Sequence, residues 1–199
     1  MERLKKHDNL IIVFIIAILL LGNCFNFYLK NSDEAINFLN IYKMTKGLEI
    51  YKDTNVIITP LFFYIGELFF KIFDNNIFVF RVYNLILATT MYLLCYIILK
   101  ELKIRKLISL LCTLFIMLFT YNLFLAGANY NILSFILFEF GILILLKSNN
   151  LEEANIKRNS NKINKYTDFL QGLILFLIIF SNHKLGCGYF GGLVVYYII

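Results

Sequence analysis

The stretch IFVFRVYNLILATTMYLLCYIIL, residues 77–99, is an apolar run long enough to cross a bilayer as one helix. A helix needs about 20 apolar residues to cross a hydrocarbon core about 30 Å thick. This run holds a single charged residue, Arg81, close to its start. Two further apolar runs lie at residues 107–125 and 132–146. These runs predict an all-α, polytopic integral membrane protein.

The overall composition agrees with a membrane protein. Of the 199 residues, 60% are hydrophobic and 16% are charged, whereas soluble domains are nearer half apolar and a quarter charged. The single proline excludes a collagen-like chain, and the 21 Phe and 13 Tyr residues exclude a solvated disordered chain. A net charge of +6 would suggest a nucleic-acid partner in a soluble protein. Here the basic residues lie between apolar runs, so we expect no nucleic-acid partner.

Both ends of the chain add predicted spans. Residues 9–29 follow a basic N-terminus and predict an uncleaved first span. Two shorter runs, 169–180 and 185–199, predict two tilted spans, a re-entrant pair, or one span with a fragment. Residues 148–165 predict a flexible connector. We therefore expect five or six transmembrane helices in one membrane domain. Because the chain stops inside an apolar run, we expect it to be the N-terminal part of a longer protein.

The basic residues predict the orientation, because cytoplasmic loops near span ends are enriched in Lys and Arg. If the N-terminus is cytoplasmic and residues 30–76 do not cross, twelve of the 19 basic residues lie on the cytoplasmic side. Residues 30–76 then form an external loop, and the polar residues 181–184 lie on the same outer side. We expect the protein in a bacterial plasma membrane, in contact with membrane lipids. Protein partners are not indicated.

The external loop is predicted to carry two amphipathic helices at the membrane surface. Apolar residues in 35–44 recur at helical spacing with polar residues between them. Thr59 predicts the cap of a second helix at 61–73. Within that helix Glu67 and Lys71 stand four residues apart, which is the spacing of an ion pair. A solvated loop between spans is the alternative interpretation.

Charged residues near the predicted outer surface are candidates for chemistry. Asp33 and Glu34 follow the first span, and a carboxylate beside lipid can act as a general base because partial desolvation raises its basicity. The same pair can instead favour a helix start through the helix dipole. Arg81 and Lys184 are cations expected on the same side. They can stabilise a phosphate, or they can extend along apolar surface to reach water.

Glu139 is an acid deep inside the predicted span 132–146. An acid at this depth marks either an interior polar contact or a functional site. The sequence identifies no partner for it, so both roles stay open.

No motif in the sequence predicts a metal or nucleotide site. Cys24, Cys95, Cys112 and Cys187 lie in or beside apolar runs and lack the spacing of metal ligands. Residues 186–191 match GxGxxG, but they lie in an apolar segment and not after a predicted strand. We expect no cofactor, and the sequence leaves a divalent metal open.

The order of several short motifs resembles a known family. In chain order these are Asp33-Glu34, the stretch Gly47 to Tyr51 to Asp53, Thr59-Pro60-Leu61, Phe80-Arg81, and Ser181-Asn-His-Lys184-Leu-Gly186. This order resembles the N-terminal portion of the GT-C membrane glycosyltransferases. The similar branch is that of the protein O-mannosyltransferases and aminoarabinose transferases, which are glycosyltransferase family 39-like.

The resemblance implies inverting transfer of a sugar from a polyprenyl-phosphate donor to an acceptor hydroxyl on the outer membrane face. It implies Asp33 and Glu34 as catalytic residues, with Asp33 as the general base. It implies Arg81, Lys184 and Asp53 as substrate-binding residues, and a lipid-linked sugar as the partner.

The sequence also departs from the family pattern. The family often has Lys-Pro-Pro-Leu where this chain has Thr59-Pro-Leu preceded by Ile58, so a lysine is missing. Family members are also longer. Two alternatives therefore stay open, namely a transporter or flippase module without enzymatic activity, and an inactive truncated glycosyltransferase fragment.

Overall fold

The computed structural model describes residues 32–54, 59–124, 130–154 and 160–198, with Ile18, Leu21, Leu29 and Val56 as single residues. These described residues form seven helices, α2 to α8, and no strand. The predicted all-helical class is confirmed for this part of the chain. The predicted first span at 9–29 lies almost wholly outside the described residues.

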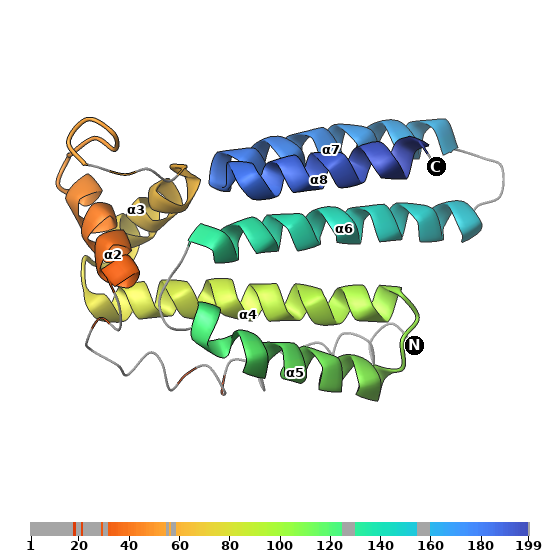
Figure 1. Ribbon diagram of the computed structural model, residues 1–199, viewed down its shortest axis with the longest axis horizontal. Coiled ribbons are helices and arrows are strands. Elements are labelled where there is room, and N and C mark those ends of the chain that lie inside the picture. Colours follow the sequence, from red (N-terminus) through yellow and green to blue (C-terminus); the bar gives the residue numbers. More distant parts are fainter. Residues whose placement is uncertain are drawn as a thin grey trace.

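The helices form a bundle with a short helix pair at one end (Figure 1). The pair consists of α2 (Ser32–Thr45) and α3 (Leu61–Phe73), which pack against each other. The bundle consists of α4 (Ile77–Glu101), α5 (Lys106–Phe124), α6 (Tyr130–Ala154), α7 (Ser160–Ser181) and α8 (His183–Ile198). Both helices predicted for residues 30–76 are therefore confirmed, and the second has the predicted bounds.

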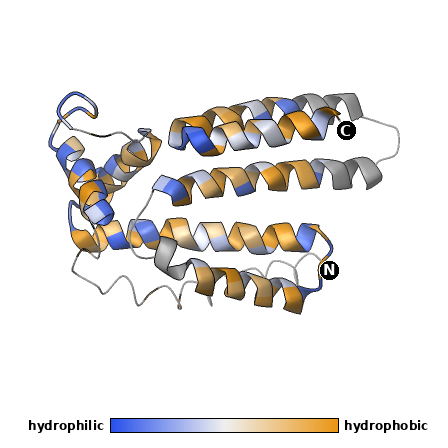
Figure 2. Ribbon diagram, in the orientation of Figure 1, coloured by the Kyte–Doolittle hydropathy of each residue, from blue (hydrophilic) through white to orange (hydrophobic). Residues whose placement is uncertain are grey.

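Two of the described helices are long and apolar enough to cross a membrane, namely α4 and residues Tyr130–Ser148 of α6. At 1.5 Å per residue, the 25 residues of α4 extend about 38 Å. Residues Lys106–Thr120 and Tyr166–Ser181 form shorter apolar helices. Hydrophobic residues dominate α4 to α6, whereas hydrophilic residues gather in the loop between α2 and α3 and at the α4–α5 turn (Figure 2).

Local sequence signals determine where several helices begin and end. Asn76 begins α4, because its side-chain Oδ1 accepts a hydrogen bond of 2.9 Å from the backbone N–H of Val79. After α4, Lys103 adopts a left-handed conformation with φ of 61°. After α2, Gly47 does the same with φ of 88°. In both turns the following N–H donates to a carbonyl of the last helical turn, which is the Schellman arrangement.

The predicted flexible connector at 148–165 is wrong at both of its ends. Helix α6 continues to Ala154 and α7 begins at Ser160. Residues 151–154, Leu-Glu-Glu-Ala, are strong helix formers that extend α6 although they carry no apolar period. Intrinsic helix propensity therefore extends the helix here, although the segment has no hydrophobic periodicity that predicts one.

Helix α2 turns polar residues toward the rest of the molecule. Its buried residues are Glu34, Asn37, Asn40, Ile41 and Met44. In contrast, Ile36 and Leu39 are 51% and 47% exposed. The helix predicted at 35–44 is present, but its apolar residues are divided between the packed face and the exposed face. An exposed apolar face on a short helix is typical of contact with lipid.

Aromatic side chains hold α2 and α3 against the start of α4. The Phe38 ring lies 5.5 Å from the Phe80 ring and 5.8 Å from the Phe70 ring, measured between centroids. The Phe62 and Tyr83 rings are 5.5 Å apart. Such tilted and edge-to-face pairs stabilise packing beyond the area they bury. The cluster brings the first turn of α2 next to the first turns of α4.

Candidate functional site

The starts of α2, α4 and α8 lie at one end of the bundle (Figure 1). The first turn of α2 carries Asp33 and Glu34, the second turn of α4 carries Arg81, and the first turn of α8 carries Lys184. The hydroxyl of Thr59 donates a hydrogen bond to the carbonyl of Ser181. The segment before α3 thus contacts the α7–α8 turn, and the outer-face position expected for both stays a prediction.

The contact of Thr59 replaces the role expected from the sequence. Thr59 was expected to cap α3, but Pro60 occupies the N-cap position and no side chain caps the helix. The hydroxyl instead bonds the α7–α8 turn, 122 residues away in sequence. A local capping pattern cannot reveal a tertiary partner at this separation.

Glu34 and Arg81 form a buried ion pair between α2 and α4. Nη1 of Arg81 donates to Oε1 of Glu34, and the two side chains are only 1% and 0% exposed, respectively. Removing two charges from water is costly, and direct pairing with hydrogen bonding offsets that cost. In this arrangement the Glu34 carboxylate is enclosed and its charge is balanced. The catalytic role predicted for Glu34 and the substrate-binding role predicted for Arg81 stay predictions.

Asp33 is exposed although its neighbour Glu34 is buried. Successive residues of an α-helix point about 100° apart, because the helix has 3.6 residues per turn. When α2 packs against α4, it therefore turns one carboxylate inward and leaves the other outside. Asp33 thus remains at the surface of the described structure.

Asp53 closes a tight loop between α2 and α3. Its Oδ2 accepts a hydrogen bond of 2.8 Å from the backbone N–H of Glu49, and its own N–H donates to the Glu49 carbonyl at 2.9 Å. Tyr51, inside this loop, has a left-handed φ of 70°. These bonds give Asp53 a structural role. Its predicted role in binding substrate stays a prediction.

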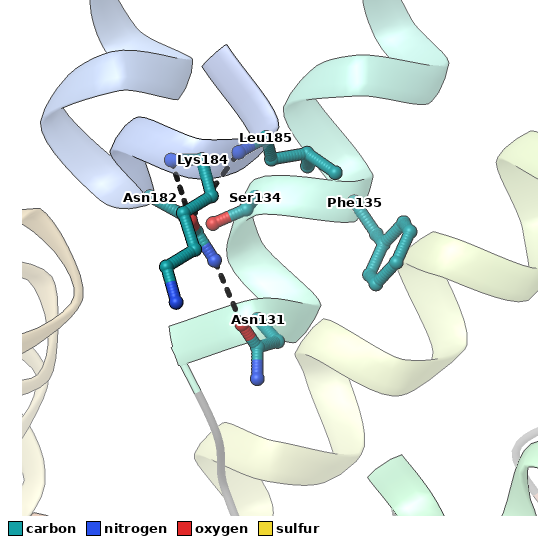
Figure 3. A pocket seen from close by; sticks show the side chains of 6 residues that line it. All are labelled: Asn131, Ser134, Phe135, Asn182, Lys184 and Leu185. Carbon is teal, nitrogen blue, oxygen red and sulfur yellow. Dashed lines mark hydrogen bonds between the residues drawn. The ribbon is translucent and has the colours of Figure 1, made fainter. Parts of the chain in front are cut away.

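A cavity of about 260 Å³ lies between the start of α6 and the α7–α8 turn (Figure 3). Its lining residues are Asn131, Ser134, Phe135, Asn182, Lys184 and Leu185. The sequence singled out Lys184 but not the two asparagines. The sequence feature that could have indicated these asparagines is that each amide side chain lies next to the end of an apolar run.

Hydrogen bonds among the residues around the cavity use most of its polar groups, and one cation borders it. Oδ1 of Asn182 accepts from the backbone N–H groups of Lys184 at 3.1 Å and Leu185 at 3.3 Å, which caps α8. Nδ2 of Asn182 donates to Oδ1 of Asn131 at 2.9 Å (Figure 3). Both amide oxygens therefore already accept hydrogen bonds, while the exposed Lys184 ammonium and the N-terminus of α8 add positive charge. An anion is the ligand that suits this arrangement.

The described residues contain no group of three or more His, Cys, Asp or Glu side chains placed to hold a metal ion. Cys95, Cys112 and Cys187 are free thiols, and Cys24 lies outside the described residues. This part of the chain therefore offers no evident metal centre.

A scan against protein-family models and searches of curated proteins and of solved structures find no match to this chain. Its function is therefore argued from its own residues and geometry.

Proposed function

We propose that the chain is a polytopic membrane protein that transfers a sugar from a polyprenyl-phosphate donor to an acceptor hydroxyl on the outer membrane face. The proposal includes five or six spans, a cytoplasmic N-terminus and an external loop at residues 30–76. It also includes the resemblance to GT-C glycosyltransferases. The observation that carries it is the cavity bordered by the exposed Lys184, at the same end of the bundle as the first turn of α2, which carries the exposed Asp33.

Exposed apolar surface supports further membrane spans beyond α4 and α6. One stripe of α5 is more than half exposed, and it consists of Leu107, Leu111, Phe115 and Leu118. These residues recur at helical spacing, so they form one continuous apolar face. Such a face is unfavourable in water and suits lipid tails. The 19 residues of α5 extend about 28 Å, which is close to the thickness of the hydrocarbon core.

In the proposed reaction the cavity binds the phosphate of the lipid-linked sugar. Its negative charge is stabilised by the Lys184 ammonium and by the N-terminal dipole of α8. The same groups stabilise the charge on the leaving phosphate when its bond to the sugar breaks.

Asp33 is the general base of the proposed reaction. Its carboxylate takes the proton of the acceptor hydroxyl while the hydroxyl oxygen forms a bond to the anomeric carbon of the sugar. The bond from that carbon to the phosphate oxygen breaks, and its electron pair leaves with the polyprenyl phosphate. Attack from the face opposite the phosphate inverts the anomeric configuration.

The buried pair of Glu34 and Arg81 positions the base in this proposal. It ties the first turn of α2 to α4, and Asp33 is the preceding residue on α2. This assignment differs from the resemblance, which implies that Glu34 is catalytic and that Arg81 binds substrate. The difference follows from the burial of both side chains.

The test is a transfer assay in membranes containing the full chain and a panel of polyprenyl-phosphate sugars. We expect Asp33→Asn to lower the transfer rate about 100-fold or more with donor binding retained, because a positioned base contributes roughly that much. Lys184→Gln should weaken donor binding about tenfold. The matched controls Glu67→Gln and Lys71→Gln remove charges of the same sign on α3 and should leave both measurements unchanged.

Two results would contradict this proposal. The first is transfer that is unchanged in Asp33→Asn. The second is absence of transfer from every donor by the folded wild-type chain. If such a chain still moves the lipid-linked sugar across a vesicle membrane, the transporter alternative is favoured instead.

A further inference from the structure

Glu139 lies in the apolar part of α6, inside the stretch Tyr130–Ser148 that is long and apolar enough to span a membrane. Its side chain is half-buried, and its Oε2 is fully covered with no hydrogen-bond partner in the described structure. Tyr92 and Cys95 of α4 lie within electrostatic range of it. Glu139 therefore sits at the contact between α4 and α6, which is the most extensive contact between helices in the described residues.

The groups around Glu139 supply no positive charge. On α4, the Tyr92 hydroxyl is 2.8 Å from the Thr120 hydroxyl of α5, and Cys95 carries a free thiol. Gln171 of α7 and Tyr189 of α8 meet α6 at the neighbouring residues Gly141 and Phe138, and they are hydrogen-bonded to each other. Ionisation of a thiol or a phenol would repel a carboxylate, and an amide is neutral.

The described cations lie away from Glu139. None of the ion pairs among the described residues includes Glu139. The nearest basic residue along α6 is Lys147, eight positions on in the sequence, which corresponds to about 12 Å of helix. Arg81 is paired with Glu34, and Lys184 lies at the first turn of α8.

Among the described residues, a carboxylate in this position has neither a counter-charge nor a complete set of hydrogen bonds. Burying an ionised carboxylate in an apolar medium without such partners is very costly, and the group takes up a proton instead. Acids within membrane spans accordingly mark proton or ion sites. A metal cation would need several oxygen ligands, and the described neighbours supply a phenol and a thiol.

We propose that Glu139 is a proton-binding site in the membrane bundle. At neutral pH its carboxyl carries a proton and lies as a neutral group between α4 and α6. At alkaline pH the proton leaves, and the uncompensated charge loosens the contact between these two helices. This site is separate from the proposed sugar transfer, so either proposal can fail alone.

The first test is infrared spectroscopy of the purified full chain in detergent. We expect a carbonyl band of a protonated carboxylic acid at neutral pH, which shifts in heavy water and fades as the pH is raised. Glu139→Gln should abolish this band, and Glu67→Gln, which removes an acid of α3 that is paired with Lys71, should retain it. If the neutral-pH spectra of the wild type and Glu139→Gln show the same protonated-acid band or none, the proposal is wrong.

The second test uses dicyclohexylcarbodiimide, an apolar reagent that reacts with protonated carboxyls. The acid adds across a C=N bond of the reagent and rearranges to an N-acylurea, so the adduct retains all atoms of both reactants. We expect mass spectrometry to find the adduct on Glu139 at neutral pH and several-fold less of it at alkaline pH. Absence of the adduct in a chain of native helicity at neutral pH would overturn the proposal.

Stability gives a third readout that is independent of labelling. Glutamine has the shape of a protonated glutamate and no charge, so Glu139→Gln should unfold at about the same temperature as the wild type at neutral pH. At alkaline pH the wild type should become less stable than Glu139→Gln. The proposed proton release would be contradicted if the difference in unfolding temperature between the wild type and Glu139→Gln were the same at neutral and at alkaline pH.

Discussion

Breaking the buried pair of Glu34 and Arg81 should destabilise the packing of α2 on α4. Both side chains are almost completely enclosed, so solvent screening hardly weakens the interaction between their charges. Removing one partner of such a pair leaves an uncompensated buried charge and typically costs about 3–5 kcal/mol. For a chain of this size about 1 kcal/mol lowers Tm by about 2–4 °C. We therefore expect Arg81→Met and Glu34→Met each to lower Tm by about 6–20 °C.

The double variant separates the ion pair from simple loss of side-chain contacts. When both residues become methionine, no buried charge is left unpaired, and replacing a buried pair by apolar residues is often neutral. The double variant should therefore unfold within about 5 °C of the wild type, which corresponds to about 1–2 kcal/mol. Glu49→Gln, which removes one partner of the exposed pair of Glu49 and Lys52, serves as the control and should have little effect.

The measurement is thermal unfolding of the purified chain in detergent, followed by circular dichroism. A double-mutant cycle gives the coupling energy of the two side chains. A buried ion pair is excluded if either single variant lowers the free energy of unfolding by less than about 1 kcal/mol. It is also excluded if the decreases of the two single variants add up to the decrease of the double variant.

Further predictions concern backbone conformation, close packing and surface charge, all measured by the same unfolding assay. Lys103→Gly should raise stability by up to about 1 kcal/mol, because residue 103 has a left-handed φ of 61° that glycine adopts without strain; an unchanged or lower Tm would contradict this. Gly66→Ala should lower stability by about 1–3 kcal/mol, because a Cβ at this position would lie 3.0 Å from Cγ1 of Ile41. Gly172→Ala is the control, because a Cβ there meets no atom within 4 Å, and it should be neutral or stabilising. Equal effects of the two variants would contradict this expectation. Glu49→Gln removes one partner of an exposed ion pair, so it should cost less than about 0.5 kcal/mol, and high salt should remove even that difference.

The helices themselves were largely predictable from the sequence. Apolar runs predicted α4 and α6, and helical spacing predicted α2 and α3, because these patterns reflect local backbone geometry. The ion-pair spacing of Glu67 and Lys71 was also sufficient, and their side chains lie 2.6 Å apart in the structure. Each of these predictions involves residues that are close in the chain, where periodicity and propensity decide.

The candidate site was only partly predictable. Charge placement predicted that residues 30–76 and the turn at 181–184 lie on one side of the membrane. Once the basic loops are assigned to the cytoplasmic side, the number of spans between loops fixes the side of each other loop. It could not predict that Asn131 and Asn182 bond each other beside Lys184, since these residues come from different helices. Which donors a cavity presents depends on which acceptors are already used.

The sequence alone thus determined that this chain forms apolar helices and where its charged residues stand relative to them. Only the tertiary structure decided that Glu34 is enclosed with Arg81, 47 residues away, while the adjacent Asp33 stays exposed. The physical reason is that adjacent helical residues point in different directions, and the packing of α2 on α4 decides which direction faces inward. Burial of a charge is a property of the whole fold, because it requires a partner brought by another helix.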